Sequence, residues 1–127
     1  MKYLLDTCIV LRASEGKISG RLGSLIAAPE NTLLVSMSSV WEIVIKQSAG
    51  KLDVPDNFID RLEPNGYTLL PLRMEHMRTC QQLPMLHKDP FDRMIIAQAL
   101  SEKYRCITSD RIFQQYLPPE QVILEAL

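Results

Sequence analysis

Four acidic side chains stand beside apolar segments of the chain, at places where they could share one site. They are Asp6, Glu42, Asp92 and Asp110. Carboxylate oxygens are the ligands that Mg²⁺ and Mn²⁺ prefer in proteins, and no cluster of cysteine and histidine suggests zinc. A site of this kind holds one or two ions, lowers the pKa of a water molecule and stabilises charge on a phosphate. Hydrolysis of a phosphodiester is the reaction class that suits it.

Short apolar runs that alternate with helical segments must position these acids. Strands are predicted at residues 3–5, 33–35, 67–70, 106–108 and 122–124, and helices at residues 9–13, 18–26, 40–49, 55–62, 74–83, 90–100 and 111–116. Short, continuously apolar strands between helices indicate a parallel sheet that is covered on both faces. The predicted fold is therefore an open three-layer α/β/α sandwich with a parallel sheet of about five strands.

The acids fall at or near one edge of this predicted sheet. Asp6 and Asp110 follow strands directly, and Glu42 lies soon after another strand, so all three are expected where the strands end. Asp92 lies early in a helix, and its neighbours three, four and seven residues further on are apolar. Its carboxylate should therefore point toward the sheet, where an unpaired charge is costly.

Each acid also has an ordinary explanation. Asp6 could be a turn residue, and Glu42 could complete a capping box with Ser39. Asp92 could interact favourably with the helix dipole, and Asp110 could cap the last helix. Four acids that converge on one edge are harder to explain as independent caps. Their mutual repulsion would raise their pKa values and destabilise the fold unless a cation neutralised them.

The composition indicates one soluble domain spanning residues 1–127. The formal net charge is -1, so no overall basic excess indicates a nucleic-acid partner. Any such partner must bind at a local site. The apolar runs are far too short to span a membrane, and Asp6 interrupts the first run too early for a signal peptide. Three cysteines without a paired spacing suit a reducing compartment, and we expect a cytoplasmic protein.

At these residues the chain resembles a PIN-domain ribonuclease of the VapC type, the toxin of a type II toxin–antitoxin pair. The matching motifs are Leu4-Leu5-Asp6-Thr7, Ser39-Val40-Trp41-Glu42-Ile43 with Lys46, Asp89-Pro90-Phe91-Asp92-Arg93-Met94-Ile95-Ile96-Ala97-Gln98-Ala99, and Thr108-Ser109-Asp110. Each short motif is weak by itself, but the ordered set is specific and covers roughly residues 2–124.

The resemblance implies an Mg²⁺- or Mn²⁺-dependent endoribonuclease that cleaves single-stranded or looped RNA. It carries catalytic and metal-binding roles to Asp6, Glu42, Asp92 and Asp110, and it suggests that Thr108 holds a water or a carboxylate at the site. Many relatives have histidine where this chain has Cys8, which we interpret as a packing residue. Asp89 is an additional acid, for which we favour an N-cap over a supporting role at the site.

The resemblance also implies partners. These are an RNA substrate, a cognate antitoxin that inserts a segment into the cleft, and a second copy of the chain in a homodimer. Lys46 and Arg93 are candidates for contacts with RNA phosphates. Both have an alternative, because Lys46 could pair with Glu42 and Arg93 with Asp89 at helical spacing.

Other chemically capable residues have plainer interpretations. His76 is expected to face solvent, and His87 is interpreted as an ordinary loop residue that could lie near the cleft. Met74 and Met77 are expected in the core, and the core is favoured over a dimer interface for Trp41.

Two other functions compete with a nuclease. A binding module for RNA or protein could retain the acids for structure alone, and a test for RNA cleavage would separate it from an enzyme. A phosphatase of small phosphoesters is less well supported, because no Asp-x-Asp motif follows the first strand.

Overall fold

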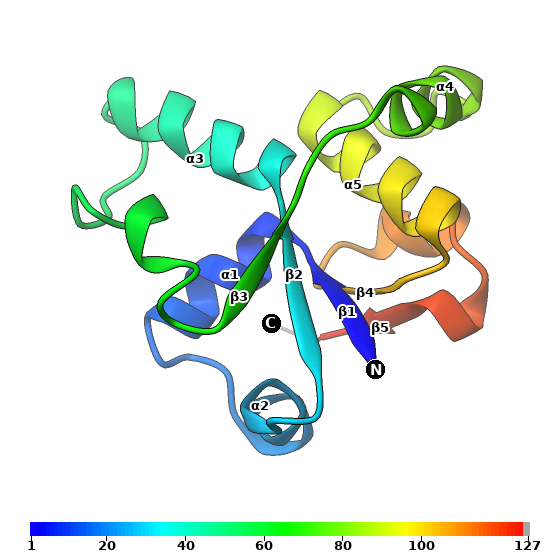
Figure 1. Ribbon diagram of the computed structural model, residues 1–127. Helices are drawn as coiled ribbons and strands as arrows, with labels where there is room; N and C mark the ends of the chain where they lie inside the picture. Colours follow the sequence, from blue (N-terminus) through cyan, green and yellow to red (C-terminus); the bar gives the residue numbers. More distant parts are fainter. Residues whose placement is uncertain (126–127) are drawn as a thin grey trace.

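Five parallel strands form the centre of the structure, a computed structural model that describes residues 1–125 (Figure 1). The strands are β1 (Lys2–Leu5), β2 (Thr32–Ser36), β3 (Tyr67–Leu70), β4 (Arg105–Thr108) and β5 (Val122–Leu124). The helices are α1 (Thr7–Ser14), α2 (Gly20–Ala27), α3 (Met37–Ser48), α4 (Met74–Gln82) and α5 (Pro90–Glu102), with short 3-10 helices η1 (Ile59–Arg61), η2 (Arg111–Gln115) and η3 (Pro119–Gln121). The five strands predicted from the sequence are all present.

The strand order is β3-β2-β1-β4-β5, so the first strand of the chain lies in the middle of the sheet. After β1 the chain builds one half of the sheet through β2 and β3, and then returns to build the other half through β4 and β5. The strand order reverses at β1, and ligands in open α/β folds bind beyond the carboxyl ends of the strands at such a point.

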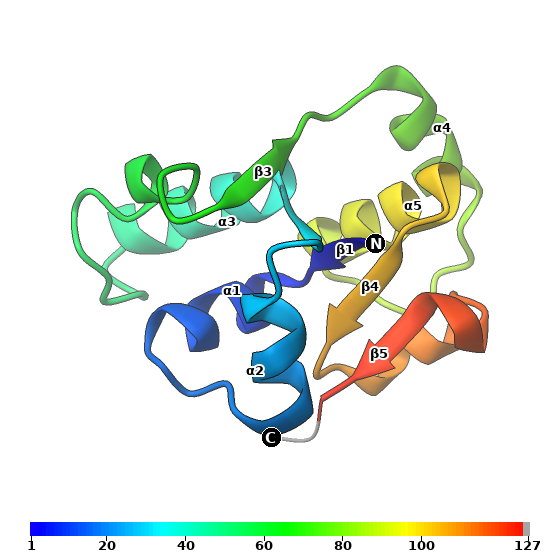
Figure 2. The same ribbon diagram turned by 60° about the horizontal axis from the view of Figure 1, so that its bottom comes forward.

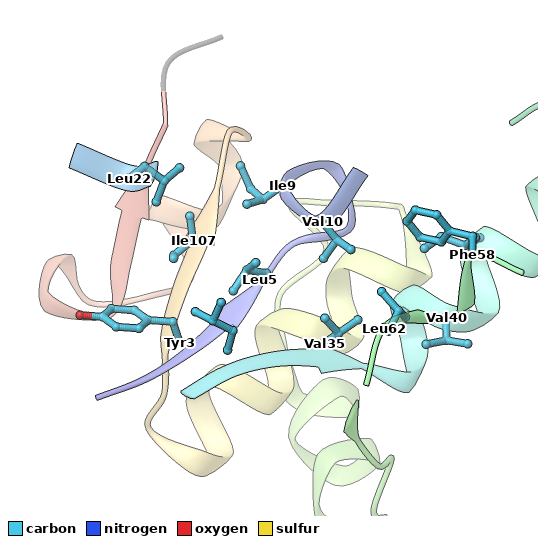
Figure 3. Close-up of a cluster of buried hydrophobic side chains, with 12 residues drawn as sticks. Tyr3, Leu5, Ile9, Val10, Leu22, Val35, Val40, Phe58, Leu62 and Ile107 are labelled. Atoms are coloured by element: carbon cyan, nitrogen blue, oxygen red, sulfur yellow. The ribbon is translucent and has the colours of Figure 1, made fainter. Parts of the chain in front are cut away.

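Both faces of the sheet are buried at its central strands β1 and β2, which explains why these strands are almost continuously apolar. Leu5 and Val35 belong to one hydrophobic cluster, drawn in Figure 3, together with Ile9 of α1 and Leu22 of α2. Leu4, the residue before Leu5, points to the other face and belongs to a second cluster. Successive strand residues point to opposite faces, so the central strands β1 and β2 need apolar residues at nearly every position.

Helices cover the two faces and make the three-layer sandwich that the sequence predicts. Figure 2 shows the sheet with α1 and α2 on one side and α5 on the other. The buried face of α5 contributes Ile95, Ile96 and Ala99 to the second cluster, as expected from their spacing. Helix α3 begins directly after β2 and contacts both α1 and α5, so it closes the carboxyl edge of the sheet.

Two local predictions were wrong. Helix α3 begins at Met37, and its N-cap is Ser36, whose hydroxyl accepts a hydrogen bond from the Ser38 N–H at 3.0 Å. The expected capping box of Ser39 and Glu42 therefore does not form. The helix predicted at residues 55–62 is reduced to the single 3-10 turn η1, flanked by other turns.

Three expected core residues lie on the surface. Trp41 is 60 % exposed and Met74 is 65 % exposed, and Met77 is also exposed. The prediction was wrong because the opposite faces of α3 and α4 pack inward, so apolar character alone did not identify the buried face. By contrast, the apolar residues Leu22, Leu25 and Ile26 of α2 do pack against the core.

No helix of the described residues is long and apolar enough to cross a membrane.

Candidate active site

Asp6 is held at the boundary between β1 and α1. Its backbone N–H donates to the carbonyl of Ile107 at 2.9 Å, which continues the pairing of β1 with β4 by one residue. Its carboxylate is buried, and Oδ2 accepts a hydrogen bond from Thr108 Oγ1 at 2.7 Å. The ends of two neighbouring strands thus position this acid, and Thr108 holds a carboxylate as the resemblance suggested.

Glu42 enters the site from α3, one turn later in the helix than the sequence indicated. Its side chain is 6 % exposed. Oε2 accepts a hydrogen bond from Lys46 Nζ at 2.7 Å, which confirms the expected pair at helical spacing. Oε1 is buried and has no hydrogen-bond partner among the described residues. A buried carboxylate oxygen without a donor is costly, so this atom calls for an additional partner such as a cation.

Asp92 lies in the first turn of α5, and the residues before it explain its placement. Asp89 is the N-cap, as expected, and its Oδ1 accepts hydrogen bonds from the Phe91 and Asp92 N–H groups at 2.9 and 3.2 Å. Pro90 occupies the start of the helix, where its missing N–H is harmless. The carboxylate of Asp92 is therefore free to face the strand ends.

The two carboxylate oxygens of Asp110 have different partners. Its Oδ1 accepts a hydrogen bond from the Ile112 N–H at 3.0 Å and caps η2, so the capping interpretation is confirmed. Its Oδ2 faces the site, where it lies 3.3 Å from His87 Nε2. The cap orients Asp110, because Oδ1 binds the Ile112 N–H and Oδ2 then points into the site.

His87 was the main residue that sequence reasoning missed. Its Nε2 lies 2.8 Å from Asp92 Oδ2 and 3.3 Å from Asp110 Oδ2, so the ring bridges two of the predicted acids. It stands in the loop between α4 and α5 and is not an ordinary loop residue. Its position five residues before Asp92 was the available signal, but nothing in the sequence showed that the loop turns back over the helix.

Burial, together with the charges of the cluster, raises the pKa values of two acids. Burial raises the pKa of Asp6 to about 6, the hydrogen bond from Thr108 opposes this, and the charges of Glu42 and Asp110 add to it. Burial also raises the pKa of Asp92, the charge of Asp6 raises it further, and the hydrogen bond with His87 opposes the rise. The acids are therefore close enough to repel each other, which a divalent cation would relieve.

The donor set fits a divalent metal ion. Carboxylate oxygens predominate, one of them is a buried atom without a partner, and two of the acids have raised pKa values. The structure brings together all four acids that the sequence singled out, and it adds the His87 nitrogen to them.

The two basic candidates have different surroundings. The ammonium of Lys46 is half-exposed and bound to Glu42, which raises the pKa of the lysine. The guanidinium of Arg93 donates to the backbone carbonyls of Cys80, Leu83, Pro84 and His87. Within residues 1–125 it forms no ion pair with Asp89, so the alternative pair proposed from its spacing is absent. Arg93 thus anchors the loop that carries His87.

His76 was expected to face solvent, but it is fully buried between α4 and α5, where Nε2 lies 3.0 Å from Glu102 Oε1. The prediction was wrong because α4 packs against α5 with the ring turned inward, toward Gln98 and Glu102. Cys8 lies near the site, and its sulfur accepts a hydrogen bond from Ser109 Oγ at 3.6 Å.

A cleft of about 620 Å³ lies elsewhere, between α1 and residues 53–67. Its lining contains none of the four acids and neither histidine. The candidate chemistry therefore does not use this cleft.

Two solved structures share this fold over nearly their whole length. A chain of VapBC2 from Rickettsia felis, crystallised with a DNA fragment from its promoter, has a TM-score of 0.73 at 19 % identity; the match covers 99 % of this chain and 98 % of that one. A chain of a toxin–antitoxin complex from Klebsiella pneumoniae has a TM-score of 0.65 at 18 % identity, with 98 % and 99 % covered. None of the curated proteins matches the sequence significantly.

The fold and the site define a parallel α/β domain with an acidic cluster at the carboxyl edge of its sheet. A family model described as the PIN domain matches residues 3–116. The chain therefore belongs to the PIN domain family.

Proposed function

We propose that this protein is a metal-dependent endoribonuclease and the toxin of a VapC-type toxin–antitoxin pair. The observation that carries the proposal is the convergence of Asp6, Glu42, Asp92 and Asp110, two of them with raised pKa values. Membership of the PIN domain family and the shared fold with two toxin–antitoxin structures support it.

The four acids are the proposed ligands of Mg²⁺ or Mn²⁺. When bound, such an ion supplies a more acidic water and neutralises charge on the phosphate that is attacked. Thr108 holds the Asp6 carboxylate in place, and Lys46 restrains one oxygen of Glu42 so that the other faces inward. These residues keep the donors arranged before the substrate arrives, which lowers the cost of reorganisation.

The proposed substrate is RNA, held by its phosphates beside the acidic cluster. Lys46 is the better placed of the two basic candidates, because its ammonium is half-exposed at the edge of the cluster. Arg93 remains a candidate, although its guanidinium already donates to the loop carbonyls.

The proposed partner is an antitoxin that covers this site in the cytoplasm. The proposal rests on the resemblance and on the shared fold, since both solved structures are described as toxin–antitoxin or VapBC assemblies. Co-expression with the product of a short reading frame beside the gene, followed by co-purification, checks it.

Asp92→Asn is the direct test of the nuclease. The substitution keeps the size of the side chain and removes one charged ligand, so we expect growth arrest and RNA cleavage to be lost while the protein stays folded. Expression of both forms, with sequencing of RNA ends and circular dichroism of the purified proteins, measures this. Loss of activity is expected to be at least about a hundredfold.

Glu63→Gln is the matched control, because Glu63 is an exposed acid outside the cluster. It should cleave RNA like the wild type. If Asp92→Asn retains full activity, the assignment is wrong. If the wild type binds RNA but leaves it uncut at every Mn²⁺ concentration, the chain is a binding module instead.

We also propose a homodimer that buries the outer face of α3. Met37, Trp41, Val44 and Ile45 are exposed there at helical spacing, and such a stripe is typical of an interface. Trp41→Lys should shift sedimentation toward the monomer. Met74→Lys, a change of an exposed apolar residue on α4, should leave the dimer intact, and equal effects of both variants would contradict the assignment.

A further inference from the structure

In the described part of the chain, each of the two histidines lies close to acidic side chains, which makes two groups of residues. The distances between the ligand atoms of each group would allow it to hold a metal ion. One group consists of Glu75, His76 and Glu102. The other consists of His87, Asp92 and Asp110. In each group one ligand atom per residue lies within 4.8 Å of the others. The hydrogen bonds around each ring decide which of the two can bind an ion.

Both ring nitrogens of His76 take part in hydrogen bonds. Its Nδ1 accepts a hydrogen bond from the Arg73 N–H at 3.1 Å. An imidazole whose Nδ1 accepts must carry its proton on Nε2, and this proton points to Glu102 Oε1 at 3.0 Å. A metal ion on Nε2 would require that proton on Nδ1, where it would meet the Arg73 N–H. The His76 group is therefore not a metal site.

The ring of His87 is free of this restriction. Among residues 1–125 its Nδ1 makes no hydrogen bond, so either nitrogen can carry the proton. The backbone of the residue is fixed, because its N–H donates to the Tyr116 hydroxyl at 2.9 Å and its carbonyl accepts from Arg93. Nε2 is thus held close to two carboxylates. When the proton is on Nδ1, the lone pair of Nε2 is available to a metal ion.

We propose that His87 Nε2, Asp92 and Asp110 together bind one divalent transition-metal ion, of which Mn²⁺ is the probe. The inference rests on the proposed function and adds a nitrogen ligand to its acidic site. One imidazole and two carboxylates form a mixed nitrogen and oxygen set, which favours a transition metal over Mg²⁺. His87 and His76 are the two histidines of the chain, so a nitrogen signal has few possible sources.

The position of the group supports an ion there. The side chains of His87 and Asp92 are 19 % and 16 % exposed, so the ligands are sheltered but reachable from solvent. Asp110 Oδ1 and the backbone of His87 are each occupied by other bonds, which orients the remaining donor atoms toward one point. Pre-oriented ligands of this kind are typical of metal sites in proteins.

The test uses Mn²⁺ binding to purified wild type, His87→Gln and the control Lys88→Gln. Pulsed electron paramagnetic resonance detects nitrogen bound to Mn²⁺, and calorimetry measures the Kd for Mn²⁺ and for Mg²⁺. We expect an imidazole signal in wild type and Lys88→Gln and its loss in His87→Gln. The Kd for Mn²⁺ should rise about tenfold or more in His87→Gln, and the Kd for Mg²⁺ much less.

The outcomes separate this inference from the proposed function. If wild type binds Mn²⁺ without a nitrogen signal, the inference is overturned and the acidic site stands. If the signal survives His87→Gln and disappears in His76→Gln, the inference is also overturned. If neither Mn²⁺ nor Mg²⁺ binds at millimolar concentration, the metal site itself fails. Circular dichroism confirms that each variant is folded, and His87→Ala provides a second variant.

Discussion

The carboxyl group of Asp6 has little contact with water, and other acids surround it. Burial and the charges of Glu42 and Asp110 together outweigh its hydrogen bond from Thr108, so the pKa rises to about 6 from an ordinary value of 3.8. The folded protein therefore binds this proton more tightly than the unfolded chain does. The ionised group destabilises the fold, which is the opposite of a carboxylate that is held by a salt bridge.

Asp6→Asn should therefore stabilise the metal-free protein near pH 8 while it abolishes activity. The carboxyl group carries no penalty below pH 3.8, and its destabilising effect grows until the pH exceeds about 6. Removing the charge should raise the free energy of unfolding by about 2 to 3 kcal/mol at pH 8. Asparagine can still accept the hydrogen bond from Thr108. Urea unfolding at pH 8 and at pH 4 measures the difference.

Glu63→Gln serves as the control for this measurement, because that carboxylate is exposed and distant from the cluster. Its effect should stay within about 0.5 kcal/mol at both pH values. A lower stability of Asp6→Asn than of wild type at pH 8, without metal, would contradict the prediction that the ionised, buried carboxylate destabilises the fold.

The loop between α4 and α5 is the element that places His87. The Tyr116 hydroxyl donates to the carbonyl of Pro84 at 2.6 Å, and it accepts from the N–H groups of Leu86 and His87, both at 2.9 Å. Arg93 donates to the carbonyls of Leu83 and Pro84 in the same loop and to the carbonyl of Cys80 near the end of α4. One phenol and one guanidinium thus replace the backbone pairing that a regular element would provide.

Tyr116→Phe should loosen this loop without disturbing the core. The four hydrogen bonds of the Tyr116 hydroxyl are lost, in a partly exposed position, so we expect a decrease of about 1 to 2 kcal/mol in the free energy of unfolding. The same variant should weaken Mn²⁺ binding, because His87 loses its backbone anchor. Urea unfolding and calorimetry measure the two effects.

Tyr104→Phe is a suitable comparison, since within the described residues the Tyr104 hydroxyl makes no hydrogen bond, and its ring lies under Lys2. It should unfold almost like wild type. If Tyr116→Phe behaves in the same way, the loop is held by Arg93 alone.

At the scale of the whole molecule, metal binding and folding are linked. The cluster is assembled from α3, α5 and the ends of β1 and β4, so it exists only in the folded chain. An ion that binds the folded state alone stabilises it by about 2.7 kcal/mol at a hundred times its Kd. Protons compete with the ion for the carboxylates of Asp6 and Asp92, because the pKa values of both groups are raised.

Mg²⁺ or Mn²⁺ should therefore raise the Tm, and more at pH 8 than at pH 5. At pH 8 both acids are ionised and the ion relieves their repulsion, whereas at pH 5 it must displace protons. Differential scanning calorimetry checks this with and without roughly 10 millimolar Mg²⁺, a concentration range in which linkage becomes visible. Asp92→Asn should reduce the shift, and an equal shift at both pH values would contradict the linkage.

Much of the fold could be predicted because it depends on local pattern. The apolar runs that became β1 and β4 need no partner to be recognised, since a strand buried on both faces is apolar throughout. Asp6 and Asp110 follow these runs, so their arrival at one edge is a consequence of parallel pairing. The Asp89 cap is equally local, because a side chain caps the helix that begins beside it.

Residues whose surroundings come from elsewhere in the chain could not be predicted in this way. Three serines near the start of α3 could each have capped it, and the bend after β2 selected Ser36. The burial of His76 depends on the packing of α4 against α5, and the exposure of Trp41 depends on which face of α3 meets its neighbours.

By itself, then, the sequence determined the order of the strands and helices along the chain and the acids that follow the strands. The tertiary structure alone decided that His87 bridges Asp92 and Asp110 and that His76 does not serve the site. The reason is physical. Periodicity and capping act over a few residues, whereas the proton positions and contacts of a histidine are set by donors and acceptors that only folding brings within hydrogen-bonding distance of the ring.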